Sequence, residues 1–416
     1  MSKVQNYNIF GRNVLSSALL CIWVALYFAP ITILSGKILS IVLLVVSAYT
    51  MLRSVFNKNY HLMVLYIFML SYSIIPLSYY FEGESINIRT LCETPETVYN
   101  TALCLLLFYI CMIWIVYFPK SKPVNCPTIH NDNNYWICFL FGLFLTIVGM
   151  SGTNILEGGG YSESIEQSQR SSLYGYAIIP ISLAFIYSDT KRKDLFLYCL
   201  VAFYCVKNLL FGGRIETLQL CLCVFLMRFQ YKWSLKKVIF ILISGYMVLT
   251  IWGLFRQISS GSFSDITFTP DGNAGEVYYS SMRVLYMIQT GVIDWSDRIF
   301  SFVLFLISMI VPYGFLPPIA NLSSYNTTLY PCGGGGLAPV FFFAFLGFFG
   351  ILLLANVVGK SINFMNKENI SAYKYYYCVL LIATVPRWYA YYPIQIVKFC
   401  IFGVLFFLLI EKVKLK

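Results

Sequence analysis

The sequence predicts an all-α polytopic protein that crosses a membrane about twelve times, and three observations support this prediction. Of its 416 residues, 59% are apolar and only 11% are charged, whereas soluble domains average about 45–50% apolar and about 25% charged residues. The mean hydropathy is +0.72. Apolar runs of roughly 20 residues, the length of a membrane-spanning helix, follow one another along the chain. This composition argues against a soluble enzyme, a disordered chain or a nucleic-acid-binding protein.

The charge and cysteine content fit the same class. A net charge of +11 does not indicate nucleic acid here, because Lys and Arg in membrane proteins mainly determine topology. The 13 Cys residues lie mostly in apolar runs, where they behave as small hydrophobic residues. No grouping of His, Cys, Asp and Glu has the spacing of a metal site, so we expect no metal and no cofactor.

The candidate spans occupy most of the chain. They lie near residues 14–35, 38–56, 61–81, 98–118, 135–151, 173–188, 195–211, 215–231, 238–255, 299–316, 338–358, 375–392 and 394–411.

Thirteen crossing runs would place the termini on opposite sides of the membrane, and the lysines argue against that. The segments 359–374 and 411–416 carry three Lys each, so both should be cytoplasmic. Both can be inside only if one run between Phe255 and Ala338 does not cross. Phe302–Phe315 is the best candidate because Pro312 interrupts it. We interpret it as a re-entrant or interfacial helix in an external segment.

The chain then divides into three parts, with both termini in the cytoplasm. Residues 1–255 hold helices 1–9, residues 256–337 form the large periplasmic segment, and residues 338–416 hold helices 10–12. In this topology nearly every outer cation is Arg. The general preference of Lys and Arg for the inner side does not explain why the cations left outside are Arg and not Lys. The outer cations are Lys37, Arg89, Arg170, Arg214, Arg256, Arg283, Arg298 and Arg387.

The first candidate site is Gly212-Gly213-Arg214, at an outer turn between two apolar runs. Two glycines allow a tight turn and a close approach of a ligand to the backbone. An ionisable residue at membrane depth is costly and indicates function by default. The alternative is an ordinary interfacial Arg beside Glu216.

The second candidate is the segment from Gly275 to Arg283. If it is helical, Glu276 and Arg283 are seven residues apart and share one face. Such a pair can act as a general base and an anion clamp. The alternative is an exposed amphipathic helix.

Two further segments complete the set. The glycine run that includes Gly334 and Gly335 precedes an apolar run, and glycines that open a helix can present backbone N–H groups to an anion. A flexible loop has the same composition. Arg387 lies among tyrosines near the last outer turn, where the tyrosines form either an aromatic belt or a surface on which sugars stack.

On these residues, the chain resembles the O-antigen polymerase (Wzy) family of oligosaccharide repeat-unit polymerases. The resemblance covers roughly residues 205–416 and rests on four features. These are Gly212-Gly213-Arg214 opening a span, the Glu276/Arg283 helix, the Gly333–Pro339 stretch before a Phe/Gly-rich span, and the late Arg387. The N-terminal half matches only as a hydrophobic pattern, and no polar residue follows Ala338-Pro339 where the family pattern has one.

This resemblance implies a glycosyltransferase of the bacterial inner membrane that acts on its periplasmic face. It would join undecaprenyl-diphosphate-linked repeat units into O-antigen or capsule-like polysaccharide, a step of lipopolysaccharide biosynthesis. Expected partners are these lipid-linked oligosaccharides, the lipid bilayer and a chain-length regulator protein, with no nucleic acid. The implied catalytic residues are Glu276, Arg214 and Arg283, and the implied substrate-binding residues are Arg387, Arg256, Gly212, Gly213, Gly334 and Gly335.

Three other functions compete with this one. An O-antigen ligase relies on an external His, whereas His61 and His130 both fall on the inner side in our topology. A lipid-linked oligosaccharide flippase has a similar number of spans, but we find no internal repeat of the kind expected in a transporter. A small-molecule transporter is the third alternative.

The topology makes a testable prediction. A reporter fused after Leu322 should report the periplasm, and one fused after Asn366 should report the cytoplasm, because the Lys-rich segments flank a run that does not cross. The measurement is the activity of a compartment-specific reporter enzyme. A cytoplasmic signal after Leu322 would contradict the twelve-span topology.

Overall fold

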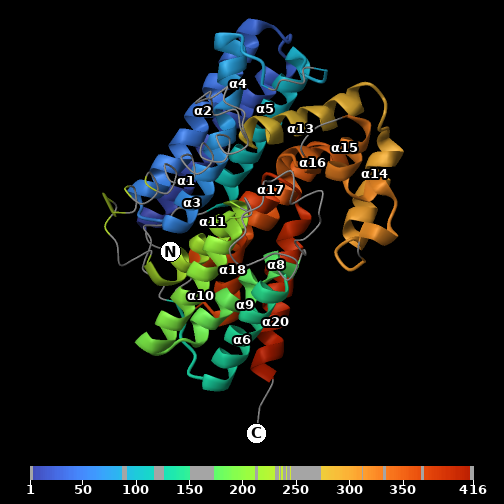
Figure 1. Cartoon of the computed structure of the whole chain (residues 1–416). Coiled ribbons are helices and arrows are strands. Elements are labelled where there is room, and N and C mark those ends of the chain that lie inside the picture. Colours follow the sequence, from blue (N-terminus) through green and yellow to red (C-terminus); the bar gives the residue numbers. More distant parts are fainter. Residues whose placement is uncertain are drawn as a thin grey trace. The chain divides into compact units, whose positions relative to one another are not determined.

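The computed structural model contains helices and no strand within the residues that it describes (Figure 1). It describes residues 3–86, 91–116, 126–149, 173–210, 214–229, 273–311, 313–330, 334–366 and 370–412, with a few single positions between 234 and 244. The all-α prediction is therefore confirmed for this part of the chain.

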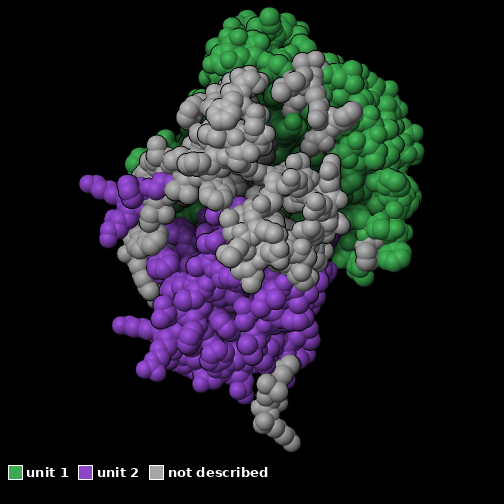
Figure 2. Space-filling model, in the orientation of Figure 1, with its two compact units in different colours: residues 1–121, 269–367, 385–397 green, residues 122–268, 368–384, 398–416 purple. Residues whose placement is uncertain are grey.

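The chain forms two compact units that are interleaved in sequence (Figure 2). Unit 1 comprises residues 1–121, 269–367 and 385–397, and unit 2 comprises residues 122–268, 368–384 and 398–416.

Unit 1 begins with four apolar segments that are long enough to cross a membrane, among the residues described. Two of them start at hydroxyl capping boxes. The Thr32 and Ser35 side chains each accept the other's backbone N–H, as do those of Thr94 and Thr97, which satisfies donors at the helix N-terminus. The elements are α1 (Lys3–Phe28), α2 (Ile33–Phe56), α3 (Tyr60–Ser73) continued by α4 (Ile75–Leu77) and η1 (Ser78–Glu82), and α5 (Pro95–Ile115).

The helix α5 forms the centre of unit 1. It is apolar on all sides and almost wholly buried, as expected for a helix surrounded by other helices. Trp23 Nε1 of α1 donates to the Leu103 carbonyl at 3.0 Å, and the Tyr99 hydroxyl donates back to the Leu26 carbonyl at 2.7 Å. These bonds fix the register between α1 and α5.

The later part of unit 1 consists of shorter helices, several of which pack on α5. They are α13 (Asn273–Gln289), α14 (Trp295–Ile307), η3 (Tyr313–Phe315), η4 (Pro318–Ala320), α15 (Leu322–Leu329), α16 (Ala338–Leu346), α17 (Phe348–Asn363), η5 (Phe364–Asn366) and α19 (Val385–Trp388).

A single span expected over residues 338–358 is instead two helices that meet at Gly347. Gly347 has φ 63°, a conformation that glycine adopts without the steric penalty of a side chain. The break leaves the Ala344 carbonyl without a helical partner, while the Phe343 carbonyl keeps the Gly347 N–H at 2.8 Å. Arg298 of α14 donates to both carbonyls, from its Nε to Ala344 at 2.6 Å and from its Nη2 to Phe343 at 2.7 Å. Its guanidinium also stacks on Trp295 at 3.7 Å.

The helix expected over Phe302–Phe315 begins earlier and ends earlier in the structure: α14 spans Trp295–Ile307 and covers only the first six residues of the expected range. A helix of 13 residues is about 20 Å long, which is shorter than the roughly 30 Å hydrocarbon core. Its N-terminus is polar and exposed, with Asp294 accepting the Asp297 N–H at 2.8 Å. The outward face carries Trp295 and Ile299, both more than half exposed.

Unit 2 is a second helical group. Its central helix, α9, is buried along its whole length. Tyr174 and Tyr204 stack with ring centroids 4.3 Å apart, and each hydroxyl donates to the other's carbonyl. The elements are α6 (Asp132–Val148), α8 (Leu173–Tyr176), α9 (Ile178–Tyr187), α10 (Lys191–Leu210), α11 (Arg214–Val224), η2 (Phe225–Phe229), α18 (Ala372–Ala383) and α20 (Phe402–Lys412), while η6 (Ile396–Ile401) continues from unit 1 into unit 2.

The described residues therefore confirm apolar helices that are able to span a membrane. The count of twelve, the membrane and the side on which each terminus lies stay predictions. Most of the run at 238–255 lies outside the described residues.

Because α16 and α17 pack closely at Gly350, we expect the stability of the protein to be sensitive to any side chain at this position. A Cβ atom there would overlap the carbonyl oxygen of Phe342, which is backbone and cannot move aside. Gly350→Ala should therefore lower the free energy of unfolding by about 1–3 kcal/mol, measured by denaturation of the purified protein in detergent. Gly314→Ala is the control, since a Cβ there meets nothing within 4 Å. Equal stability of the two variants would contradict this packing.

Candidate functional site

Unit 1 brings together three of the segments that the sequence singled out: α13, the glycine stretch and the chain around α19. The Leu337 N–H donates to Ser281 Oγ of α13 at 2.7 Å. The Ala338 N–H donates to the Tyr389 carbonyl at 2.7 Å, just after α19. Segments more than 50 residues apart in sequence are thus joined by hydrogen bonds.

The glycine stretch has a conformation that requires glycine. Gly335 and Gly336 have φ values of 122° and 143°, which residues with a side chain rarely adopt. A Cβ on Gly335 would also lie 3.1 Å from the Ala390 carbonyl oxygen. Close packing against neighbouring backbone therefore explains these glycines.

The N–H groups of this stretch are used within the protein. Gly335 N–H donates to Ser323 Oγ at 2.8 Å, and Gly336 N–H to the Ala390 carbonyl at 3.2 Å. Together with the bonds from Leu337 and Ala338, they leave no backbone donor open to an anion between Gly335 and Ala338. The expected backbone anion seat is therefore not formed at Gly335, because protein acceptors occupy it.

Arg283 is a buried cation in the middle of this group. Its side chain is 0% exposed. Its Nε donates to Asn326 Oδ1 at 3.0 Å and its Nη2 to the Asn326 carbonyl at 2.7 Å. The rings of Tyr279 and Tyr330 flank the guanidinium at 5.8 and 5.9 Å.

The third guanidinium nitrogen of Arg283 is unsatisfied. Its Nη1 is buried and has no hydrogen-bond partner in the described structure, and no described carboxylate forms an ion pair with it. A buried charge without a counter-ion is energetically costly. An anionic ligand would supply both the missing acceptor and the missing charge.

Glu276 lies two turns before Arg283 on α13, so the prediction that both belong to one helix is confirmed. The spacing puts the two residues on one face, about 10 Å apart along the axis. Glu276 is partly buried, and its Oε2 is buried without a partner in the described structure. A carboxylate oxygen in this state is able to accept a proton or a hydrogen bond from a ligand.

Asn326 and Tyr389 belong to the site although sequence reasoning did not select them. Asn326 Nδ2 donates to the Ser280 carbonyl at 3.0 Å, which orients the amide oxygen toward Arg283. The Tyr389 ring packs against Phe68 and Phe108. Its hydroxyl is buried without a partner among the described residues.

Of the remaining predicted residues, the structure describes some and leaves others outside its described part. Arg387 lies on α19, with its guanidinium 5.1 Å from the centroid of the Tyr391 ring. Arg214 is the first residue of α11 in unit 2. Gly212, Gly213 and Arg256 lie outside the described residues. The structure thus gathers Glu276, Arg283, Gly334, Gly335 and Arg387 in one unit.

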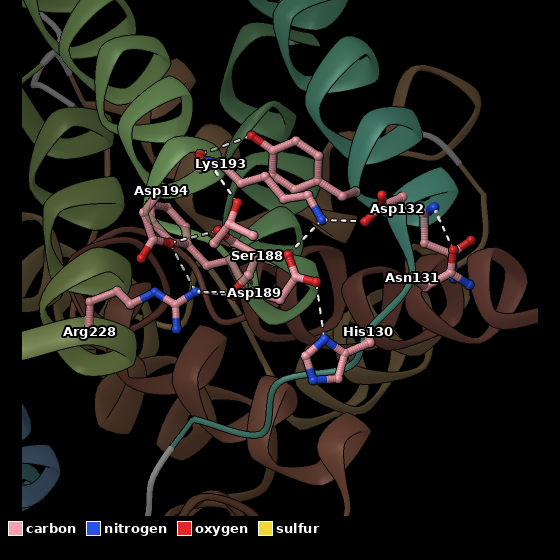
Figure 3. Close-up of polar contacts among 12 residues, drawn as sticks. His130, Asn131, Asp132, Ser188, Asp189, Lys193, Asp194 and Arg228 are labelled. Atoms are coloured by element: carbon pink, nitrogen blue, oxygen red, sulfur yellow. Dashed lines mark hydrogen bonds and ion pairs between the residues drawn. The ribbon is translucent and has the colours of Figure 1, made fainter.

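Unit 2 contains a separate polar cluster that the sequence did not reveal (Figure 3). Lys193 Nζ of α10 forms ion pairs with Asp132 at the start of α6 and, at 2.6 Å, with Asp189 between α9 and α10. His130 Nδ1 lies 3.0 Å from the other oxygen of Asp189. The cluster fastens the start of α6 to the connection between α9 and α10.

Arg228 of η2 extends this cluster. Its Nη2 donates to the Phe185 carbonyl at 2.6 Å, to the Ser188 carbonyl at 3.0 Å and to Asp194 at 3.1 Å. The Arg228 guanidinium thereby supplies a donor to carbonyls that the end of α9 leaves open. The charges in this cluster are paired with one another, so it is better suited to stabilising the helix ends than to binding a ligand.

The described residues contain no group of three or more His, Cys, Asp and Glu side chains able to hold a metal ion. The chain matches no known protein-family model, curated protein or solved structure.

The polar cluster makes the stability of the protein dependent on pH. Hydrogen bonds with Lys193 and then His130 lower the pKa of the Asp189 carboxyl from 3.8 to about 2. A lowered carboxyl pKa stabilises the fold at a pH above the unfolded value, and this stabilisation is lost as the pH falls through the folded value. The stability difference between the wild type and Asp189→Asn should therefore shrink as the pH falls from about 4 to about 2.

The measurement is the thermal midpoint of the two purified proteins in detergent across this range. Glu84→Gln, at an exposed carboxylate in a loop, controls for the loss of one negative charge. A difference that stays constant down to pH 2 would show that Asp189 does not stabilise the fold through its charge.

Proposed function

We propose that the protein is a membrane glycosyltransferase that polymerises polyprenyl-diphosphate-linked oligosaccharides on the periplasmic face of a bacterial inner membrane. The observation that carries this proposal is the state of α13. One helix holds a fully buried guanidinium with an unsatisfied Nη1 and a carboxylate with an unsatisfied Oε2. A reaction that needs an anion clamp and a proton acceptor can use both.

The chemistry matches these two groups. The bond between the anomeric carbon of the growing glycan and its lipid diphosphate breaks, and the diphosphate leaves with the bonding electrons. A hydroxyl of the incoming lipid-linked unit attacks the anomeric carbon and loses its proton. In this proposal Glu276 accepts that proton, and Arg283 stabilises the negative charge on the diphosphate.

The other predicted residues have supporting roles in the proposal. Arg387, joined to α13 through the glycine stretch, would bind the oligosaccharide or its diphosphate. Arg214 and Arg256 would bind the second diphosphate, a role that comes from the sequence alone. Gly334 and Gly335 would hold the backbone of the site, since the N–H of Gly335 is already bonded to Ser323.

The first test is the surface glycan of a strain that lacks the protein. Loss of a polymerase leaves single repeat units on the lipid core, whereas loss of a ligase or a flippase leaves none. A gel of the surface glycan separates these outcomes, and absence of single units would overturn the polymerase assignment.

The second test examines the α13 pair in the complemented strain. Glu276→Gln keeps the shape of the side chain but removes the base, so polymerisation should fall by about 10²–10⁴-fold. Arg283→Lys keeps the charge but loses the planar fork, so the polymer ladder should shorten toward single units. The measurement is the ladder at matched protein level.

Arg298→Lys is the matched control. Like Arg283, Arg298 is buried and donates from two guanidinium nitrogens, in its case to two backbone carbonyls. This variant should lower the thermal midpoint, and the ladder should change only as far as the amount of folded protein falls. If Arg283→Lys behaves in the same way, Arg283 is structural and the proposal for the pair fails. A normal ladder from Glu276→Gln would remove Glu276 as the base.

A further inference from the structure

Two cysteines lie in contact on neighbouring helices of unit 2. Cys205 Sγ of α10 and Cys221 Sγ of α11 are 3.9 Å apart as free thiols. The two helices are antiparallel, and Asn208 Nδ2 donates to Thr217 Oγ1 at 2.9 Å. This bond agrees with the cysteine contact: the later residue of α10, Asn208, pairs with the earlier residue of α11, Thr217, as expected for antiparallel helices.

We propose that Cys205 and Cys221 form an intrachain disulfide when the protein meets an oxidant that itself carries a disulfide. A disulfide has an S–S distance of about 2.05 Å, so the two sulfurs, now 3.9 Å apart, must approach each other by roughly 2 Å. Cys221 is exposed and Cys205 is partly buried. Cys221 is therefore the thiol that meets the oxidant, and Cys205 is the resolving thiol.

The reaction balances as two successive exchanges. The Cys221 thiolate attacks one sulfur of the oxidant, which expels the first thiol and leaves a mixed disulfide. The Cys205 sulfur then attacks Cys221 Sγ and expels the second thiol. The protein loses two protons and two electrons, and the oxidant is reduced to two thiols.

The disulfide would close a loop that contains Gly212, Gly213 and Arg214. It would fasten α10 to α11. As a regulatory consequence, which rests on the proposed function, fixing the start of α11, where Arg214 lies, would reduce polymerisation. The pairing itself does not depend on that function.

The test uses 2,2′-dipyridyl disulfide, a lipid-permeant oxidant, on the purified full-length protein in detergent. In the wild type, peptides containing Cys205 and Cys221 should be recovered joined, with two hydrogens lost and no pyridyl group retained. Cys199 is an exposed thiol on the same helix. It should retain a pyridyl group, which shows that the reagent reaches α10.

The variants make the result specific. In Cys205→Ser, the pyridyl group should remain on Cys221, because the resolving thiol is missing. Cys223→Ser alters a buried thiol of α11 and should leave the joined peptides unchanged. Recovery of Cys221 in the wild type with its pyridyl group still attached, and no joined peptide, would overturn the proposal.

The regulatory part is tested separately in membranes. Oxidation should weaken the polymer ladder of the wild type, a reductant should restore it, and Cys221→Ser should be insensitive. If the joined peptides form but the ladder does not change, the regulation is wrong while the disulfide stands. If the strain that lacks the protein shows no single repeat units on the lipid core, the proposed function is refuted, and the disulfide is unaffected.

Discussion

The structure depends on one constraint: wherever a helix stops in apolar surroundings, its open backbone groups must find partners within the protein. Unit 1 meets this constraint at two places. At Gly347, the Arg298 side chain supplies donors to the carbonyls at the end of α16. Before α16, the hydroxyls of Ser323 and Ser281 accept the N–H groups of Gly335 and Leu337. The second place is also the candidate site, so the bonds that permit irregular backbone also join the segments of that site.

Two buried arginines illustrate the difference between support and function. Arg298 uses two nitrogens on helix carbonyls and stacks on Trp295, which explains its burial. Arg283 also uses two nitrogens, both on Asn326, yet its Nη1 remains buried without a partner in the described structure. Burial alone therefore does not identify the site. The unpartnered Nη1 is what distinguishes Arg283 from Arg298, and on α13 it is accompanied by the unpartnered Oε2 of Glu276.

The sequence predicted those features that depend on neighbouring residues. Apolar length predicted the helical class, and the spacing of Glu276 and Arg283 predicted their common helix. The break at Gly347 was missed, because its cap comes from Arg298, 46 residues before Ala344. Asn326 lies 43 residues beyond Arg283, and hydrophobic periodicity contains no signal for such a pairing. The ion-pair cluster of unit 2 was missed for the same reason, since it joins three separate helix ends.

The broken helix has a consequence for how the protein is made. The nine residues of α16 are too few to be recognised as a membrane span, for which about 20 are needed. Together with α17 they form one continuous apolar stretch, so the insertion machinery should receive residues 338–363 as a single span. Synthesis proceeds from the N-terminus, and Arg298 is therefore already present when this stretch emerges. The guanidinium can then take up the carbonyls as soon as the helix bends at Gly347, without waiting for any later part of the chain.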